Sequence, residues 1–134
     1  MANIHHNRTS ILIVDDHEVV RNGIRSYLET VKEFHVVGEA ASGEEAVKLV
    51  SEYIPDIVLL DLEMPKHDGY EVIVTLRKYL DASVPIVACT VHTAEINRTR
   101  KLGFSGFIAK PLDMDRFSEQ VRRILNGEPI WEAR

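Results

Sequence analysis

Polar side chains of complementary chemistry follow four short apolar runs of this 134-residue chain. Asp15 and Asp16 follow the first run, Asp61 the third, Thr90 ends the fourth and Lys110 follows the fifth. If these runs are strands of one parallel sheet, their carboxyl ends lie along the same edge, at which such sheets bind ligands. The sequence therefore predicts three carboxylates, one hydroxyl and one ammonium group at a single site.

This set of groups suits magnesium-assisted phosphoryl transfer. Carboxylates held close together repel one another, and each then has a raised pKa. A Mg²⁺ ion relieves the repulsion, prefers oxygen ligands and often completes its shell with phosphate oxygens. Asp61 is the central candidate nucleophile, since carboxylates can form aspartyl phosphates. Lys110 can pair with one phosphoryl oxygen, and Thr90 can donate a hydrogen bond to another.

Taken singly, the same residues have ordinary structural interpretations. Asp15 or Asp16 alone would be read as a helix N-cap, and Asp61 as a turn residue. Thr90 alone would be a polar strand end, and Lys110 a solvated loop lysine. Four strand ends with compatible chemistry at one edge favour the functional interpretation.

Five apolar runs supply the strands that must position these residues. Most are continuous rather than alternating, which is typical of strands buried on both faces. They are Ile11–Val14, Phe34–Val37, Ile57–Leu60, Val84–Cys89 and Gly106–Ala109. Segments with helical spacing lie between and after them. The alternation predicts an α/β fold, a flavodoxin-like doubly wound (βα)5 three-layer sandwich whose five-stranded parallel sheet has the order 2-1-3-4-5.

Local signals place several helix ends. Ser42 and Glu45 are spaced as a capping box, and Asp113 is a candidate N-cap for the last helix. Gly103 and Gly127 stand where helix C-caps are expected. The helix around 93–102 has the weakest apolar pattern, and its expected buried side chains are Ala94, Ile96 and Leu102.

Composition excludes several classes of protein. The chain is 45% hydrophobic and 28% charged, which is ordinary for a globular domain. A net charge of −5 disfavours direct binding to nucleic acid. The one cysteine, Cys89, lies in an apolar run and is expected to be a core residue. Because neither a signal peptide nor a membrane-spanning run is found, a cytoplasmic location is expected and no membrane contact.

Four motifs resemble those of the response regulator receiver family of two-component phosphorelay systems. The resemblance runs from about Ile11 to Gly127, and the set of motifs is more specific than any one of them. The segments 11–17 (ILIVDDH), 61–69 (DLEMPKHDG), 85–90 (PIVACT) and 106–111 (GFIAKP) carry it. Val20, Arg21 and Gly23 resemble the subfamily that often carries a DNA-binding helix-turn-helix domain.

The resemblance implies a role for each site residue. Asp61 is the phosphoacceptor, and Asp15, Asp16, Asp61 and the backbone carbonyl of Glu63 hold Mg²⁺. Thr90 and Lys110 bind the phosphoryl group. Thr90 and Phe107 form the switch, in which Phe107 turns inward and the face of the fourth helix, fifth strand and fifth helix changes. The Lys110–Pro111 peptide bond is commonly cis in the family.

Some positions depart from the family's commonest pattern. Phe107 is often Tyr in the family, so any switch here must depend on packing alone. Val91 replaces a smaller residue and could narrow access to the phosphoryl group. Glu63 and His92 occupy positions that tend to set phosphoryl lifetime, although an exposed loop charge and a solvated residue are the plainer interpretations.

Three other functions would each need a different set of residues. A haloacid-dehalogenase-type phosphatase needs a second Asp two residues after the nucleophile, where this chain has Glu63. A receiver-like binding module that is never phosphorylated would not need the complete site found here. A dinucleotide or flavin binder would need a glycine-rich loop after the first strand, where the chain has Asp15 and Asp16.

The expected organisation is one domain. Residues 1–10 are expected to form a flexible N-terminus, 11–127 the receiver domain and 128–134 a short tail. The chain is expected to be a phosphoacceptor that assists its own phosphorylation and dephosphorylation, not an enzyme. Expected partners are a histidine kinase or histidine phosphotransfer protein, with a downstream protein or missing output domain. Two alternatives stay open: a complete regulator or a fragment, and a phosphorylation-dependent homodimer.

Overall fold

The computed structural model describes residues 8–64, 67–91 and 93–132. Strands and helices alternate along the chain, with one short hairpin, β4–β5, inserted after β3. The strands are β1 Thr9–Val14, β2 Phe34–Ala40, β3 Ile57–Asp61, β4 Glu63–Met64, β5 His67–Asp68, β6 Ile86–Thr90, β7 Gly106–Ala109 and β8 Trp131–Glu132. The helices are α1 Glu18–Glu29, α2 Gly43–Glu52, α3 Gly69–Leu76, α4 Ile96–Lys101 and α5 Met114–Leu125, with a short 3-10 helix at Thr93–Glu95.

The main sheet confirms the predicted architecture. Its strands have the order β2-β1-β3-β6-β7-β8, and every neighbouring pair is parallel. The five predicted strands are β1, β2, β3, β6 and β7, so their order is the expected 2-1-3-4-5 once the hairpin β4–β5 is set aside. The strand β8 was not predicted. It adds a sixth parallel strand beside β7, from residues expected to form only a tail.

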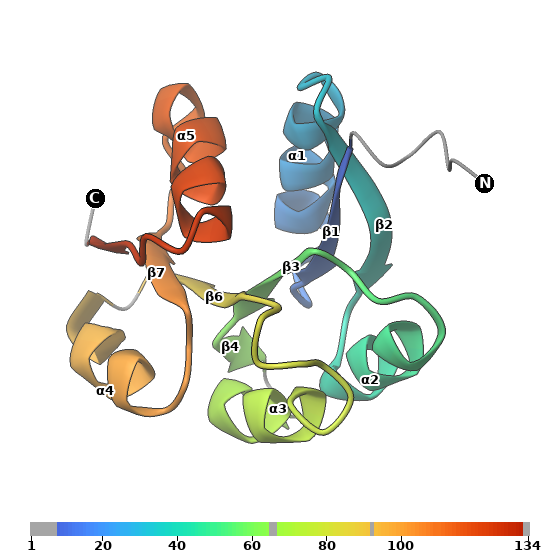
Figure 1. Ribbon diagram of the computed structural model, residues 1–134, viewed down its shortest axis with the longest axis vertical. Helices are drawn as coiled ribbons and strands as arrows, with labels where there is room; N and C mark the ends of the chain where they lie inside the picture. The colour runs from blue at the N-terminus through green and yellow to red at the C-terminus, as the bar shows by residue number, and fades with distance from the viewer. Residues whose placement is uncertain (1–7, 65–66, 92, 133–134) are drawn as a thin grey trace.

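Helices cover both faces of the sheet (Figure 1). Helices α1 and α5 lie on one face, over a core that includes Ile11, Phe34 and Phe117. Helices α2, α3 and α4 lie on the other, over a core that includes Leu12 and Phe107. Neighbouring residues of β1 enter opposite cores because side chains alternate along a strand. This double burial explains the continuous apolar runs of the sequence.

Most of the predicted helix ends are confirmed. The Ser42 hydroxyl accepts a hydrogen bond from the Glu45 N–H at 3.2 Å, and Asp113 caps α5 through the Asp115 N–H at 3.0 Å. Gly103 and Gly127 have φ values of 91° and 89°, the left-handed conformation that favours glycine after a helix.

The buried face of α4 was predicted incorrectly. Leu102 is 45% exposed and Ala94 is exposed, whereas Ile96 packs partly buried as expected. The helix ends at Lys101, so Leu102 lies beyond its last turn, and Thr99 takes the fully buried position. Thr99 is tolerated there because its hydroxyl donates a hydrogen bond to the Ile96 carbonyl at 2.7 Å.

Candidate functional site

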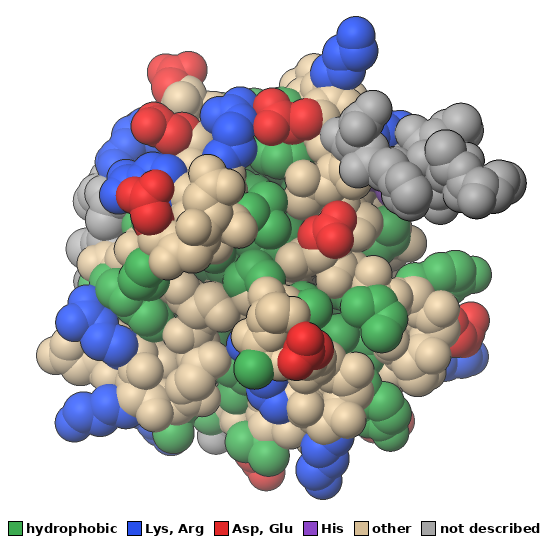
Figure 2. All heavy atoms as spheres, viewed as in Figure 1, with side chains coloured by type: hydrophobic (Ala, Val, Ile, Leu, Met, Phe, Trp, Pro, Cys, Tyr) green, Lys and Arg blue, Asp and Glu red, His purple; other side chains and the backbone are tan. Residues whose placement is uncertain are grey.

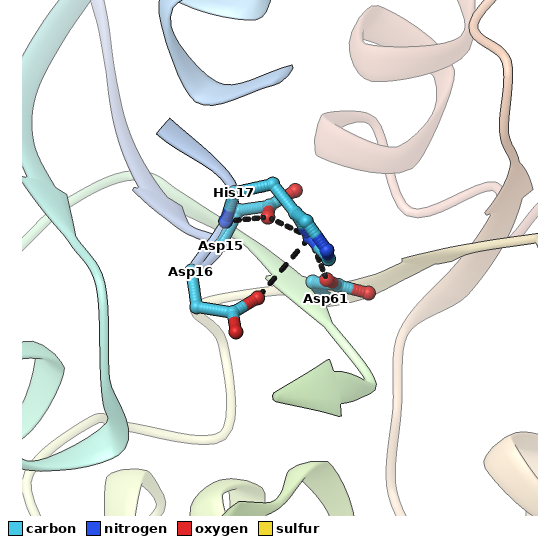
Figure 3. Close-up of side chains that lie close together, drawn as sticks. All are labelled: Asp15, Asp16, His17 and Asp61. Atoms are coloured by element: carbon cyan, nitrogen blue, oxygen red, sulfur yellow. Dashed lines mark hydrogen bonds and ion pairs between the residues drawn. The ribbon is translucent and has the colours of Figure 1, made fainter. Parts of the chain in front are cut away.

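The carboxyl ends of β1 and β3 bring together the predicted acidic residues. These strands are neighbours in the sheet, with Val14 paired to Leu60. Asp15 and Asp61 are each only 2% exposed, whereas the Asp16 side chain is 21% exposed. One ligand atom from each of Asp15, Asp16, Asp61 and the adjacent His17 lies within 4.8 Å of the others (Figure 3).

Lys110 reaches this group from the end of β7. Its Nζ donates a hydrogen bond to Asp15 Oδ2 at 2.6 Å and lies 3.6 Å from Asp61 Oδ2. The N–H of Lys110 donates to the Thr90 carbonyl at 2.9 Å, which joins the ends of β6 and β7. The Lys110–Pro111 peptide bond is cis, as the family resemblance implies.

The remaining predicted residues occupy different surroundings. Thr90 ends β6 and is completely buried, and Phe107 is also completely buried, within the core under α4. Glu63 is exposed on β4, and its N–H donates to Asp61 Oδ1 at 3.1 Å. Val91 is 53% exposed beside the site. His92 lies outside the described residues.

Two residues that the sequence reasoning did not assign to the site help to build it. The His17 Nδ1 lies 3.2 Å from both Asp15 Oδ1 and Asp16 Oδ1, and 3.8 Å from Asp61 Oδ2 (Figure 3). Arg21 donates to the Asp15 carbonyl at 2.6 Å and pairs with Glu39 at 3.1 Å, which ties the end of β1 to β2. The position of His17 directly after two aspartates was the only sequence signal for its place in the cluster.

Burial and mutual repulsion disfavour the charged form of the central carboxylate. Burial raises the pKa of Asp61 from 3.8 to about 6, with a smaller contribution from the Asp15 charge, against the opposing effect of Lys110. Burial alone would lower the pKa of Lys110, but its hydrogen bond to the Asp15 carboxylate and the charge of Asp61 raise the pKa overall. A strongly perturbed carboxylate beside a cation is a common property of functional sites.

Cys89 takes no part in this chemistry. It is a buried cysteine that forms no disulfide among the described residues. In the register of the sheet its backbone lies opposite that of Asp61, on the neighbouring strand β3. Burial raises the pKa of its thiol to about 12, so it stays protonated at neutral pH. This agrees with its expected role as a core residue.

The donor atoms of the cluster fit a hard divalent cation. Two buried carboxylate oxygens, Asp16 Oδ1 and Asp61 Oδ2, make no hydrogen bond within the part of the chain that the structure describes. Buried carboxylate oxygens are normally hydrogen-bonded or coordinated. The two oxygens of Asp15 are already used, by His17 and Lys110. Asp16 Oδ1 and Asp61 Oδ2 are therefore the carboxylate oxygens that can coordinate a divalent cation at this edge.

We predict that Asp61 titrates near pH 6 in the metal-free protein and that Mg²⁺ lowers this value. Burial and the Asp15 charge raise its pKa, and a nearby cation favours the carboxylate. Carboxyl-carbon NMR on protein with labelled aspartate measures both values, and Asp61→Asn assigns the signal. A metal-free midpoint at the ordinary value of 3.8 would contradict the described environment.

Residues 11–122 match the family model described as the response regulator receiver domain. The transcriptional regulatory protein DegU of Brevibacillus brevis is 34% identical over 125 residues, covering 92% of this chain and 53% of that protein. The response regulator protein VraR of Staphylococcus aureus is 37% identical over 123 residues, covering 91% of this chain and 59% of that protein. The chain thus spans between half and two thirds of the length of these relatives.

A solved structure of a response regulator is similar to this chain in both sequence and fold. A two-component response regulator of the LuxR family from Aurantimonas sp. SI85-9A1 is 34% identical, with a TM-score of 0.83 over 92% of this chain and 89% of that one. Among the described helices, none is long and apolar enough to cross a membrane. The family match, the relatives and the strand order agree, and the chain belongs to the response regulator receiver family of two-component systems.

Proposed function

We propose that Asp61 accepts a phosphoryl group from a phosphohistidine donor, in a reaction that requires Mg²⁺. The observation that carries the proposal is the buried carboxylate of Asp61, which has one oxygen without a hydrogen bond among the described residues and a lysine ammonium 3.6 Å from it. An unshielded carboxylate oxygen is a competent nucleophile, and the adjacent ammonium can neutralise charge on the arriving phosphoryl oxygens.

The transfer exchanges one bond to phosphorus for another. Asp61 Oδ2 attacks the phosphorus, the P–O bond of an acyl phosphate forms, and the P–N bond to the donor histidine breaks. The donor imidazole keeps the electron pair of that bond. Lys110 leaves Asp15 to pair with a phosphoryl oxygen, and Thr90 donates a hydrogen bond to another.

The residues proposed to hold Mg²⁺ are Asp16 and Asp61 through their side chains, with Asp15 and the Glu63 carbonyl in support. When bound, the ion neutralises the carboxylates and the phosphoryl oxygens. His17 Nδ1 lies beside the same oxygens, so its ring would neighbour the ion.

The proposed consequence is a change at the face formed by α4, β7 and α5. Thr90 and Phe107 lie on adjacent strands, β6 and β7, so a shift of Thr90 toward the phosphoryl group acts on the packing around Phe107. The donor would be a histidine kinase or a phosphotransfer protein. The output would pass to a downstream partner or domain, since DegU is named a transcriptional regulator.

Incubation with acetyl phosphate and Mg²⁺, followed by intact-mass measurement, tests the proposal. The wild type is expected to gain one phosphoryl group, and both EDTA and Asp61→Asn are expected to abolish the gain. Asp56→Asn is the matched control, since Asp56 lies just before the opposite end of β3 and binds Ser10. Equal gain in Asp61→Asn and wild type would refute the site, and no gain in any sample would favour the unphosphorylated binding module.

A further inference from the structure

His17 stands between β1 and α1 with its ring turned toward the acidic cluster (Figure 3). It is the N-cap residue of α1, yet its side chain makes no capping hydrogen bond. Its N–H donates a hydrogen bond to Asp15 Oδ1 at 2.8 Å, which fixes the backbone at this point. The ring is therefore not needed to hold the end of the helix and is available to the site.

The ring nitrogen that faces the cluster is shared among three carboxylates. Nδ1 lies 3.2 Å from Asp15 Oδ1, 3.2 Å from Asp16 Oδ1 and 3.8 Å from Asp61 Oδ2. A ring nitrogen that makes one ordinary hydrogen bond lies about 2.9 Å from a single acceptor. Adjacent ligands of one transition-metal ion, each bound at about 2.1 Å, lie about 3.0–3.4 Å apart. The distance from Nδ1 to Asp16 Oδ1 is in this range, and the distance to Asp61 Oδ2 is only slightly longer.

Two oxygens of the cluster lack a partner of their own. Asp16 Oδ1 and Asp61 Oδ2 are buried and make no hydrogen bond within the described part of the chain, and the Asp61 side chain is only 3% exposed. With His17 Nδ1 they form a set of one nitrogen and two oxygen donors. The Asp and Glu side chains on the face shown in Figure 2 are instead scattered, and several lie beside Lys or Arg.

An open pocket leads to these donors. It has a volume of about 380 Å³ and is lined by His17, Leu62, Glu63 and Met64. The His17 side chain is 61% exposed, so the ring borders solvent on one side and the carboxylates on the other. A hydrated ion can therefore reach the donors without any opening of the core.

This donor set favours a transition-metal ion over magnesium. Mg²⁺ binds oxygen ligands and keeps several of its waters, so a nitrogen donor adds little to its binding. Imidazole nitrogen suits zinc, copper, nickel and iron, and the affinity of a mixed nitrogen and oxygen set rises along the first transition row from Mn²⁺ to Cu²⁺. A nitrogen placed among carboxylates therefore shifts the preference of the site away from Mg²⁺.

We propose that His17 binds a divalent first-row transition-metal ion through Nδ1, together with Asp16 and Asp61, and so makes this site prefer such an ion to Mg²⁺. The inference rests on the metal-assisted site proposed above, because both ions use the same two carboxylates. The two ions therefore compete, and His17 determines which of them the site holds when both are present.

The test measures metal affinity and the identity of the ligands rather than phosphoryl transfer. Calorimetry gives the dissociation constants of Co²⁺ and Mg²⁺ for the whole protein and for two variants. His17→Phe keeps a ring and removes both nitrogens, whereas His17→Asn offers an amide oxygen in place of Nδ1. Both variants should fold, since the His17 side chain is 61% exposed. Pulsed EPR of the Mn²⁺ form detects nitrogen bound to the ion.

A control is needed because other histidines can bind transition-metal ions. The chain has six, and His5 and His6 are adjacent in the sequence. A double variant, His5→Gln with His6→Gln, removes this pair and leaves His17 in place. It should bind both ions as the wild type does and keep the nitrogen signal of the wild type.

The wild type is expected to bind Co²⁺ more tightly than Mg²⁺ and to show nitrogen coupling in the EPR spectrum. Both His17 variants should bind Co²⁺ weaker by about tenfold or more, bind Mg²⁺ nearly as the wild type does, and lose the nitrogen coupling. Unchanged Co²⁺ affinity, no nitrogen coupling in the wild type, or an equal loss of affinity for both ions would overturn the inference. The proposed function would survive these results if Mg²⁺ still supports phosphorylation of Asp61. A wild type that binds neither ion would overturn both.

Discussion

Replacement of Asp61 by asparagine is expected to stabilise the metal-free protein near pH 7 by about 1–3 kcal/mol. The carboxylate is buried, and its pKa is raised from 3.8 to about 6. At neutral pH the fold must therefore hold a charge that its surroundings disfavour. Asparagine has nearly the same shape, and its oxygen can still accept the hydrogen bond from the Glu63 N–H. The attraction to Lys110 that asparagine loses is already included in this net pKa.

The sign of the pH dependence follows from the direction of this shift. The folded pKa of Asp61 lies above the ordinary value, so its destabilising effect is absent below pH 3.8 and complete above about pH 6. The advantage of Asp61→Asn should shrink by about 1 kcal/mol between about pH 7 and pH 5. Urea unfolding of both proteins at the two pH values measures the difference in their free energies of unfolding. Groups that titrate alike in both proteins contribute equally and drop out of this difference.

Magnesium should narrow or reverse the difference in stability between Asp61→Asn and the wild type. An ion that binds only the folded wild type stabilises it by about 2.7 kcal/mol at a hundred times its dissociation constant, whereas Asp61→Asn has lost one carboxylate ligand. Asp56→Asn, just before the opposite end of β3, should respond to Mg²⁺ as the wild type does. If metal-free Asp61→Asn is less stable than the wild type near pH 7, the buried charge of Asp61 does not destabilise the fold.

Replacement of Lys110 by methionine is expected to slow phosphoryl transfer to Asp61 by about a hundredfold, the usual effect of removing one charge-stabilising donor. The ammonium lies 3.6 Å from Asp61 Oδ2, close to where the phosphoryl oxygens must arrive. Methionine has similar length and no charge, so the loss isolates the electrostatic contribution.

Each variant is incubated with acetyl phosphate and excess Mg²⁺, and samples quenched at successive times are analysed by intact mass. The increase of the phosphorylated fraction with time gives the rate of phosphoryl transfer. Lys78→Met, at an exposed position after α3, should keep the wild-type rate. Lys110→Arg retains the charge and should recover part of the loss, although its planar group differs in shape from an ammonium. A Lys110→Met rate equal to that of the wild type would remove Lys110 from the proposed mechanism.

The sequence was sufficient for the sheet and for the acidic edge because both depend on local patterns. Continuous apolar runs specify strands buried on two faces, and parallel strands must end at one edge. Asp15, Asp16 and Asp61 therefore converge wherever those runs form the sheet. Lys110 follows the same rule from β7.

Other features depend on contacts that no local pattern encodes. His17 joins the cluster through the direction of its side chain, and Arg21 through a hydrogen bond to a backbone carbonyl. The strand β8 is too short for periodicity to be seen, and it forms because Gly106 leaves room at the edge of β7. In α4 the polar Thr99 is buried because its hydroxyl donates a hydrogen bond to the Ile96 carbonyl, whereas the apolar pattern alone favours Leu102.

The most direct test of the central claim is to locate the phosphoryl group. Borohydride reduces an aspartyl phosphate to homoserine, which peptide mass spectrometry detects at a single position. After treatment with acetyl phosphate and Mg²⁺, residue 61 is expected to be converted to homoserine, and it should remain aspartate without the donor or with EDTA. Homoserine at residue 15 or 16, or a stable adduct on His17 with residue 61 unchanged, would contradict the assignment of Asp61 as the phosphoacceptor.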